Sequence, residues 1–104
     1  MPAPRPSALP VAAEKAIACL DALAAEFKTR GWTAHVATAP PRHPRLLVQD
    51  PGDDARCEHV LAAPADSTGD WWFWYPWAER ISPADDTRNA ADKVVQLLRA
   101  TSTP

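Results

Sequence analysis

The residues that could do chemistry in this 104-residue chain are histidines, cysteines and one acidic residue inside an aromatic run: His35, His43, His59, Cys19, Cys57 and Glu79. Cys57 and His59 are two positions apart, so on a strand they would share a face, where the imidazole could take the proton of the thiol. No third group that would orient the imidazole is identifiable, and the histidines are not spaced as in a compact zinc site. We therefore expect no catalytic residue and no metal site.

Glu79 is the acidic residue embedded near the end of the segment DWWFWYPWAERI, which spans residues 70–81. A carboxylate beside several indoles can accept their N–H groups, whereas a buried carboxylate with a raised pKa can transfer protons. We favour the first role, because paired carboxylates in proteins are mostly structural. An enzyme acting through Cys57, His59 or Glu79 is therefore the least favoured of three functional hypotheses.

The same segment holds four of the five tryptophans and the only tyrosine. If it is a strand, period two places Trp72 and Trp74 on one face and Trp71, Phe73 and Tyr75 on the other. Pro76 lacks an N–H group, so it should sit at an edge or a bulge, and a bulge would shift the phase of the residues that follow. The set that then shares a face, and that we expect to bind a partner, is Trp72, Trp74, Trp77 and Glu79.

The elements that must position these residues follow from periodicity and from turn residues. Apolar residues recur at helical spacing over 10–30, and Gly31 is suited to end that helix because it can adopt positive φ. Three further strands are expected between loops rich in Pro, Gly and Asp, over 32–39, 45–50 and 55–63. A second helix should begin with Ser82 as N-cap, Pro83 as its first residue and Asp85 as its third.

This order is α-β-β-β-β-α, and the short connections favour a four-stranded antiparallel meander. The apolar stripes of two amphipathic helices can be buried only on the sheet, which gives a two-layer α+β fold. The length is that of one domain. We place the domain at 10–100, between a disordered Pro-rich tail at 1–9 and a frayed tail at 101–104.

Composition and charge exclude several functional classes. The net charge is −2, and Arg80 is the only basic residue among the aromatic residues of 70–81, so direct nucleic-acid binding is not expected. Only three glycines are present, none in a phosphate-binding loop, and we expect no cofactor. No apolar run approaches the length of a membrane span, and the N-terminus lacks the apolar core of a signal peptide. We expect a cytoplasmic protein with reduced cysteines and no membrane partner.

Charge is unevenly distributed along the chain. Residues 1–45 carry a net charge of +3, and residues 46–104 carry a net charge of −5. Such asymmetry can steer a partner, or one subunit onto another, although chance variation would also produce it.

The residues from Trp72 to Asp86 resemble the pattern W-F-W-x-x-W-A-E-x-I-x-P-x-D-D. This pattern is similar to a segment of small uncharacterised proteins from high-GC Gram-positive bacteria, and LLVQDP and EHVLAAP extend the resemblance over roughly residues 31–99. Those proteins are often found beside helix-turn-helix regulators. The resemblance therefore implies an accessory regulatory role and assigns no catalytic residue.

The leading hypothesis is a non-enzymatic protein-interaction module that forms a homodimer through an aromatic sheet face, with a regulatory protein as a further partner. We infer this dimer from the aromatic rings that the sheet would leave exposed, because a contiguous apolar surface marks an interaction site. The alternative for that face is that long loops and the N-terminal tail cover it. The alternative function is a small-ligand-binding domain with a Trp-lined pocket.

Overall fold

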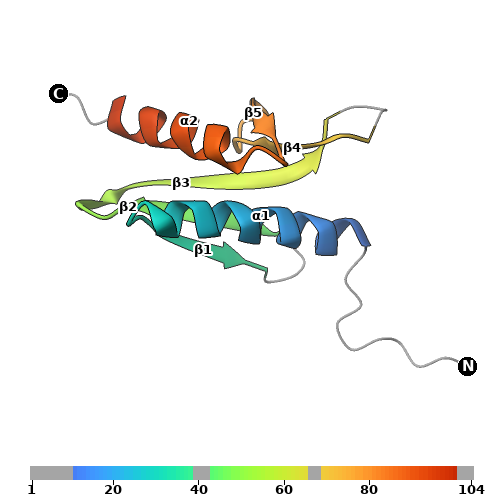
Figure 1. Cartoon of the computed structure of the whole chain (residues 1–104), viewed down its shortest axis with the longest axis horizontal. Helices are drawn as coiled ribbons and strands as arrows, with labels where there is room; N and C mark the ends of the chain where they lie inside the picture. Colours follow the sequence, from blue (N-terminus) through green and yellow to red (C-terminus); the bar gives the residue numbers. More distant parts are fainter. Residues whose placement is uncertain (1–10, 39–42, 66–68, 101–104) are drawn as a thin grey trace, which may run out of the picture.

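The computed structural model describes residues 11–38, 43–65 and 69–100, which form two helices and one five-stranded sheet (Figure 1). The expected tails at 1–9 and 101–104 lie outside the described residues. The elements in chain order are α1 (Val11–Thr29), β1 (Thr33–Ala37), β2 (Arg45–Asp50), β3 (Asp53–Pro64), β4 (Trp71–Trp74), β5 (Arg80–Pro83) and α2 (Thr87–Ala100).

The helix α1 ends as its sequence predicts. Gly31 has φ of +81°, and its N–H group donates to the Lys28 carbonyl at 3.0 Å. The Trp32 N–H group donates to the Phe27 carbonyl, also at 3.0 Å, which completes a Schellman motif. The Trp32 and Phe27 rings then pack with centroids 6.3 Å apart, and both side chains are buried. The end of the helix therefore fixes where the sheet begins.

The sheet is an antiparallel meander in the order β1-β2-β3-β4-β5, and β3 is its central and longest strand. The first part of β3 pairs with β2, from Cys57 to Val60, and its last part pairs with β4, from Leu61 to Pro64. Alternate residues of the strands are buried on one face of the sheet: Ala34, Leu46, Val48, Val60, Ala62 and Phe73.

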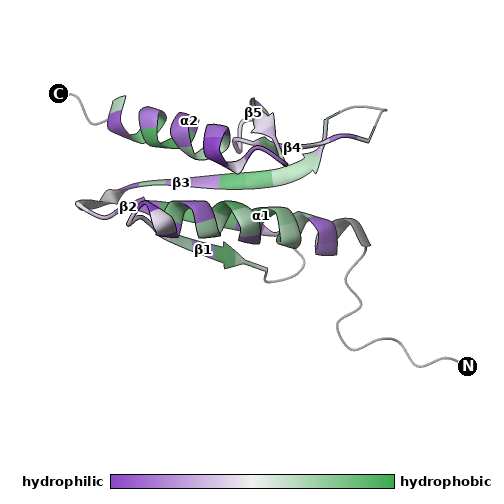
Figure 2. Cartoon of the chain, viewed as in Figure 1, coloured by the Kyte–Doolittle hydropathy of each residue, from purple (hydrophilic) through white to green (hydrophobic). Residues whose placement is uncertain are grey.

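Both helices cover that face, so the domain has two layers as the sequence predicts. The helix α1 contacts β1, β2 and β3, α2 contacts β3 and β5, and the two helices contact each other. Arg30 at the end of α1 donates to Asp92 of α2 at 2.6 Å and to Glu26 at 2.9 Å. The hydrophobic residues of α2 lie on its side toward β3, with polar residues outward (Figure 2).

The sheet has five strands rather than the expected four, because the aromatic segment is a hairpin and not one strand. A turn separates β4 from β5. In it the Ala78 N–H group donates to the Tyr75 carbonyl at 3.0 Å, and the Tyr75 N–H group donates to the Glu79 carbonyl at 2.8 Å. Pro76 occupies the second position of this turn, where its fixed φ is favourable. Ala78 takes the left-handed conformation, with φ of +69°. The bulge predicted at Pro76 from its missing N–H group is therefore wrong, because that residue lies in a turn, where no ladder donor is needed.

The second helix begins later than predicted. Ser82 and Pro83 belong to β5, and α2 starts at Thr87. Its N-cap is Asp86, whose carboxylate accepts the Asn89 N–H group at 3.1 Å. The fully buried Ser82 hydroxyl instead lies 3.2 Å from the Asp86 carbonyl. The expected cap therefore failed because pairing of Ser82 with Phe73 extends the sheet into the segment.

Candidate interaction surface

The sheet face opposite the helices carries two tryptophans on β4, the strand next to the central strand β3. Cross-strand pairing places Trp72 between Ala63 and Pro83, and Trp74 between Leu61 and Arg80. Neighbouring strands align their paired residues on the same face. Both indoles are partly buried, and within the described residues no helix packs over them. We call this surface the open face; it comprises His35, Arg45, Leu47, Cys57, His59, Leu61, Ala63, Trp72, Trp74, Arg80 and Pro83.

Specific contacts hold both indoles of the open face. The Trp74 Nε1–H group donates to the Ala63 carbonyl at 3.0 Å. The Arg80 guanidinium lies 5.0 Å from the centroid of the Trp72 ring, within the range of a cation–π contact. Rings that are fixed before binding lose little conformational entropy when a partner docks, so the open face is suited to recognition.

The ionisable groups of the open face are basic. His35 and His59 both pair with Leu47, and Arg45, which pairs with Ala37, has the same strand phase as Leu47. Arg45, His35 and His59 therefore share the open face with Arg80. The carboxylate of Glu58 has the opposite strand phase and lies close enough to the helix-side Tyr75 to raise its pKa. Acidic residues instead lie at the ends of β4 and β5, where Asp70 and Asp85 are exposed.

Trp77 and Glu79 do not join Trp72 and Trp74, contrary to the sequence prediction. Trp77 stacks on Tyr75, with ring centroids 4.7 Å apart and planes 9° apart. The Trp77 Nε1–H group donates to the Glu79 carboxylate at 2.9 Å, so Glu79 is the acceptor that its position among indoles suggests. The turn reverses the chain after Tyr75 and carries both residues to the edge of β5, beside α2. The binding roles of all four residues stay predictions.

Cys57 and His59 share the open face, as their spacing predicts. Cys19 lies on α1, on the other side of the sheet, and both cysteines are free. Burial raises the pKa of the Cys19 thiol, and nearby Lys15 opposes this effect. No group of three or more potential metal ligands occurs within the described residues.

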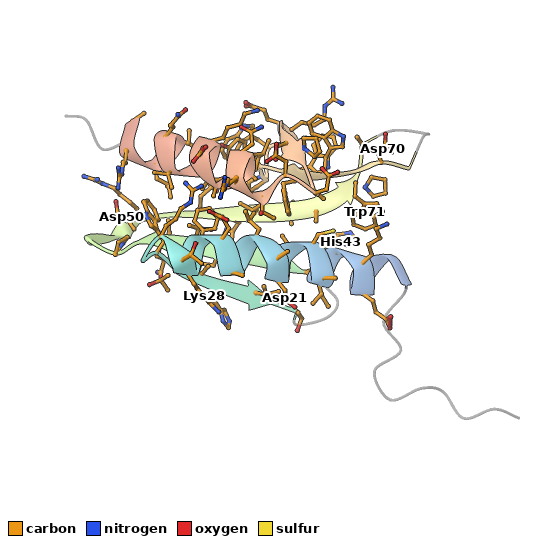
Figure 3. The ribbon with its side chains drawn as sticks, in the orientation of Figure 1. Asp21, Lys28, His43, Asp50, Asp70 and Trp71 are labelled. Atoms are coloured by element: carbon orange, nitrogen blue, oxygen red, sulfur yellow. The ribbon has the colours of Figure 1, made fainter. Side chains whose placement is uncertain are left out.

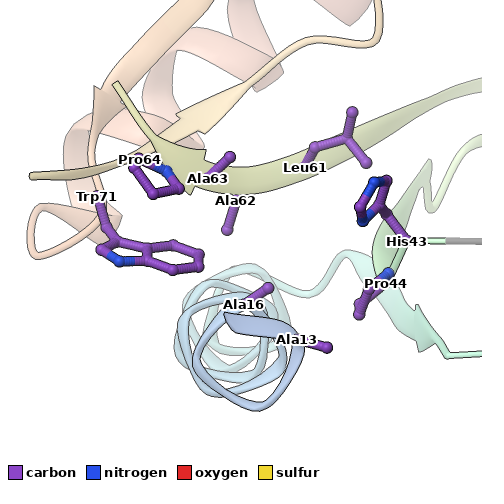
Figure 4. A pocket seen from close by; sticks show the side chains of 9 residues that line it. All are labelled: Ala13, Ala16, His43, Pro44, Leu61, Ala62, Ala63, Pro64 and Trp71. Carbon is purple, nitrogen blue, oxygen red and sulfur yellow. The ribbon is translucent and has the colours of Figure 1, made fainter. Parts of the chain in front are cut away.

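A cavity at one end of the molecule was not expected from the sequence. Its volume is about 310 Å³, and it lies where β3 has run past β2. Figure 3 places Trp71 and His43 at this end and Asp50 at the opposite end. In Figure 4 the Trp71 ring lies on one side, His43 and Pro44 lie on the other, and Ala62 lies between them above α1. The remaining lining is apolar and includes Ala13, Ala16, Leu61, Ala63 and Pro64.

The sequence predicts that Trp71 faces the helices, but nothing in the sequence marks it as the wall of a cavity. The cavity lies where α1, β3, β4 and the two residues before β2, His43 and Pro44, meet, and the described side chains do not fill the space between them. Lys15 lies 5.6 Å from the centroid of the Trp71 ring and covers another side of it.

Comparison with known protein families, with curated proteins and with solved structures found no match to this chain. Among the described helices, neither combines the length and the apolar character that crossing a membrane requires.

Proposed function

We propose that the chain is a non-enzymatic protein-interaction module that forms a homodimer through the open face. The observation that supports this proposal is the position of Trp72 and Trp74, which are held between β3 and β5 on a sheet face that no described element covers. Large aromatic side chains are the residue type in which binding energy concentrates at protein interfaces.

A second copy of the chain is the partner that the charge pattern favours. Arg45 and His35 lie toward the β1–β2 side of the open face, and the exposed Asp70 and Asp85 lie at the ends of β4 and β5. A two-fold axis along the central strand β3 would place β1 and β2 of one copy over β4 and β5 of the other, so that Arg45 and His35 approach Asp70 and Asp85 while Arg80 stays stacked on Trp72. The tryptophans of both copies would then meet near the axis, as the inner faces of a β-sandwich do.

Sedimentation or light scattering of the Trp74→Ala variant tests this proposal. We expect the dissociation constant of the dimer to rise about 30-fold in this variant. The reason is that a large aromatic residue contributes about 2 kcal/mol or more to such an interface. Trp72→Ala, which leaves the bond between Trp74 and Ala63 intact, should have the same effect. Phe73→Leu is the matched control from the helix-covered face, and it should lower the melting temperature while the mass of the folded protein stays unchanged. If both tryptophan variants kept the solution mass of the wild type, the open face would be rejected as the dimer interface.

The cavity beside Trp71 favours a second candidate function, which is the binding of a small apolar ligand. Its volume is at the lower end of the range for ligand sites, and its walls are mostly alanine, proline and indole. Ala16 lies on its wall and is buried, so Ala16→Leu should fill the cavity. Saturable binding of a small aromatic probe that Ala16→Leu abolishes, in a chain that stays monomeric, would favour this function over the first.

We further propose that the module works in the cytoplasm, beside a regulatory protein. The free cysteines on opposite sides of the sheet support a reducing compartment, since neither stabilises the fold by a disulfide. The resemblance of the Trp72–Asp86 pattern to proteins found beside helix-turn-helix regulators supports the partner. Mass spectrometry of freshly isolated protein should find both thiols reduced, and a quantitative bridge between Cys19 and Cys57 would contradict this location.

A further inference from the structure

Two potential metal ligands face outward from the middle of the central strand. Cys57 and His59 are two positions apart on the open face, near the centre of β3. The Cys57 thiol is free and exposed, and His59 is half-buried. The Glu58 carboxylate accepts the backbone N–H group of His59 at 2.9 Å, in the part of β3 that precedes its pairing with β4. Thiolate sulfur and imidazole nitrogen are ligands that Zn²⁺ prefers in proteins.

One copy of the chain provides only half of a structural zinc site at this position. Such a site holds the metal with four protein ligands in a tetrahedron. Within the described residues no group of three potential ligands occurs. His35 lies on the same face, but Leu47 lies between His35 and His59 in the pairing of the strands. A zinc site on β3 is therefore incomplete without ligands from a second molecule.

The proposed dimer supplies the two missing ligands, and the present inference rests on that dimer. Rotation about an axis along β3 leaves each residue at its own position along the strand, so Cys57 and His59 face the same two residues of the second copy. Sheets that pack face to face lie about 10 Å apart, so a metal ion midway is about 5 Å from each sheet, within reach of both side chains. Packed sheets cross at about 30°, and the middle of the central strand is where they stay closest.

We propose that Cys57 and His59 of two copies bind one Zn²⁺ ion on the two-fold axis of the dimer. Each thiol releases one proton when its sulfur binds the metal, and each imidazole binds in its neutral form. The two thiolates balance the charge of Zn²⁺, so the second sheet covers the site without burying a net charge. Gln49 pairs with Cys57 across β2 and β3, which places a side-chain amide beside the sulfur, where it can donate to the thiolate.

Titration of Co²⁺ into reduced, metal-free protein in the absence of oxygen tests the proposal. Tetrahedral Co²⁺ is strongly coloured, and its thiolate absorption follows the number of bound sulfurs. We expect one Co²⁺ ion for every two chains, and we expect Zn²⁺ to displace it. Binding should weaken as pH falls, because protons compete with the metal for the thiolates. A missing tetrahedral spectrum, or one metal ion in each monomer, would overturn the shared site.

Four variants assign the ligands. Cys57→Ser and His59→Gln should each abolish the tetrahedral spectrum, because each change removes two of the four ligands from the shared site. Cys19→Ser is the matched control for the thiol, since Cys19 lies on α1, on the other side of the sheet. His35→Gln is the matched control for the imidazole, since His35 lies on the open face away from β3. Both controls should bind the metal as the wild type does, and a wild-type spectrum in Cys57→Ser would contradict the assignment.

Solution mass with and without the metal separates this inference from the proposed dimer. With a chelator present, Cys57→Ser should dimerise as the wild type does, because both tryptophans of the open face remain. With free Zn²⁺ at about 100 times its dissociation constant from the dimer, mass action should lower the dissociation constant of the wild-type dimer about 100-fold, because the site exists only where two copies meet. Cys57→Ser should not respond to Zn²⁺.

The two proposals fail in different ways. A wild-type dimer that binds neither Co²⁺ nor Zn²⁺ would overturn the zinc site and leave the open face as an interface. A wild-type chain that stays monomeric with and without Zn²⁺ would reject both the zinc site and the dimer. Dissociation of the wild-type dimer by Zn²⁺ would show that the metal binds the separated chains, and it would overturn the shared site alone.

Discussion

At the residue scale, Ala78 is the one non-glycine residue with a positive φ in the part of the chain that the structure describes. Its φ of +69° lies in the left-handed region, which costs an L-residue other than glycine about 1 kcal/mol. The turn of Tyr75 to Glu79 requires this conformation, because the residue after a type I turn must return the chain to the second strand.

We expect Ala78→Gly to raise the free energy of unfolding by about 0.5–1 kcal/mol, because glycine adopts positive φ without a steric penalty. Denaturant unfolding, monitored by circular dichroism, measures the change. Ala25→Gly is the control, since Ala25 is an exposed residue within α1 and its replacement should destabilise by a similar amount. A loss of stability in Ala78→Gly would show that the side chain of Ala78 contributes more than its backbone costs.

The other residue with a measurable signature is Tyr75. Burial raises the pKa of its phenol above the usual value, and the negative charges of Glu79 and Glu58 add to the effect. The neutral phenol is therefore favoured in the folded state. Its contribution to stability is complete below the pKa of the unfolded tyrosine, about 10, and is lost as pH rises through the higher folded value.

Because Tyr75 is the only tyrosine, the ultraviolet absorbance of tyrosinate follows this one group. We expect the absorbance of the folded protein to rise at a higher pH than that of the denatured protein. Glu79→Gln should move the midpoint back toward the ordinary pKa, since it removes one nearby negative charge. Tyr75→Phe should lose less stability than the wild type between neutral and alkaline pH. Coincident titration of folded and denatured protein would contradict the burial of the phenol.

At the element scale, the start of α2 depends on one carboxylate. Asp86 accepts the Asn89 N–H group and so satisfies one of the backbone donors that a helix start leaves unpaired. Ser82, four residues earlier, is buried in β5 and bonds backbone carbonyls. Only three residues lie between the end of β5 at Pro83 and the start of α2 at Thr87, and the last of them, Asp86, is the N-cap.

Asp86→Ala should lower the free energy of unfolding by about 1 kcal/mol, the usual cost of losing an N-cap side chain. Asp85→Ala, one residue earlier, removes an exposed carboxylate that has no such bond and should cost only a few tenths of that amount. Thermal melts of both variants at one pH give the comparison. The reverse order of stability would mean that the helix begins before Thr87.

At the scale of the whole molecule, a homodimer links stability to concentration. If copies associate only when folded, mass action should raise the melting temperature with protein concentration. Trp72→Ala should reduce this dependence, because it removes part of the interface without touching the helix-covered core. Calorimetry over a wide concentration range provides the measurement. A melting temperature that does not change with concentration in the wild type would rule out the coupling between dimer and fold.

Local sequence determined the elements whose limits depend on near neighbours. The stripe of Leu20, Leu23 and Phe27 gave α1 nearly to its observed length, and Gly31 ended it because only neighbouring residues are needed to form that motif. Strand β2 was predicted with its observed bounds of 45–50, because Pro44 precedes it directly and Pro51 and Gly52 follow it directly. Alternation alone also placed Trp72 and Trp74 together, since period two is a property of any extended strand.

Tertiary structure decided what depends on distant partners. The segment 70–81 became a hairpin because β5 pairs with β4 and buries Ile81 beneath α2, at the cost of an unfavourable φ at Ala78. That pairing moved Trp77 and Glu79 off the open face, and it delayed the start of α2. The cavity beside Trp71 forms where elements far apart in sequence meet, so neither its volume nor its lining is contained in a local pattern.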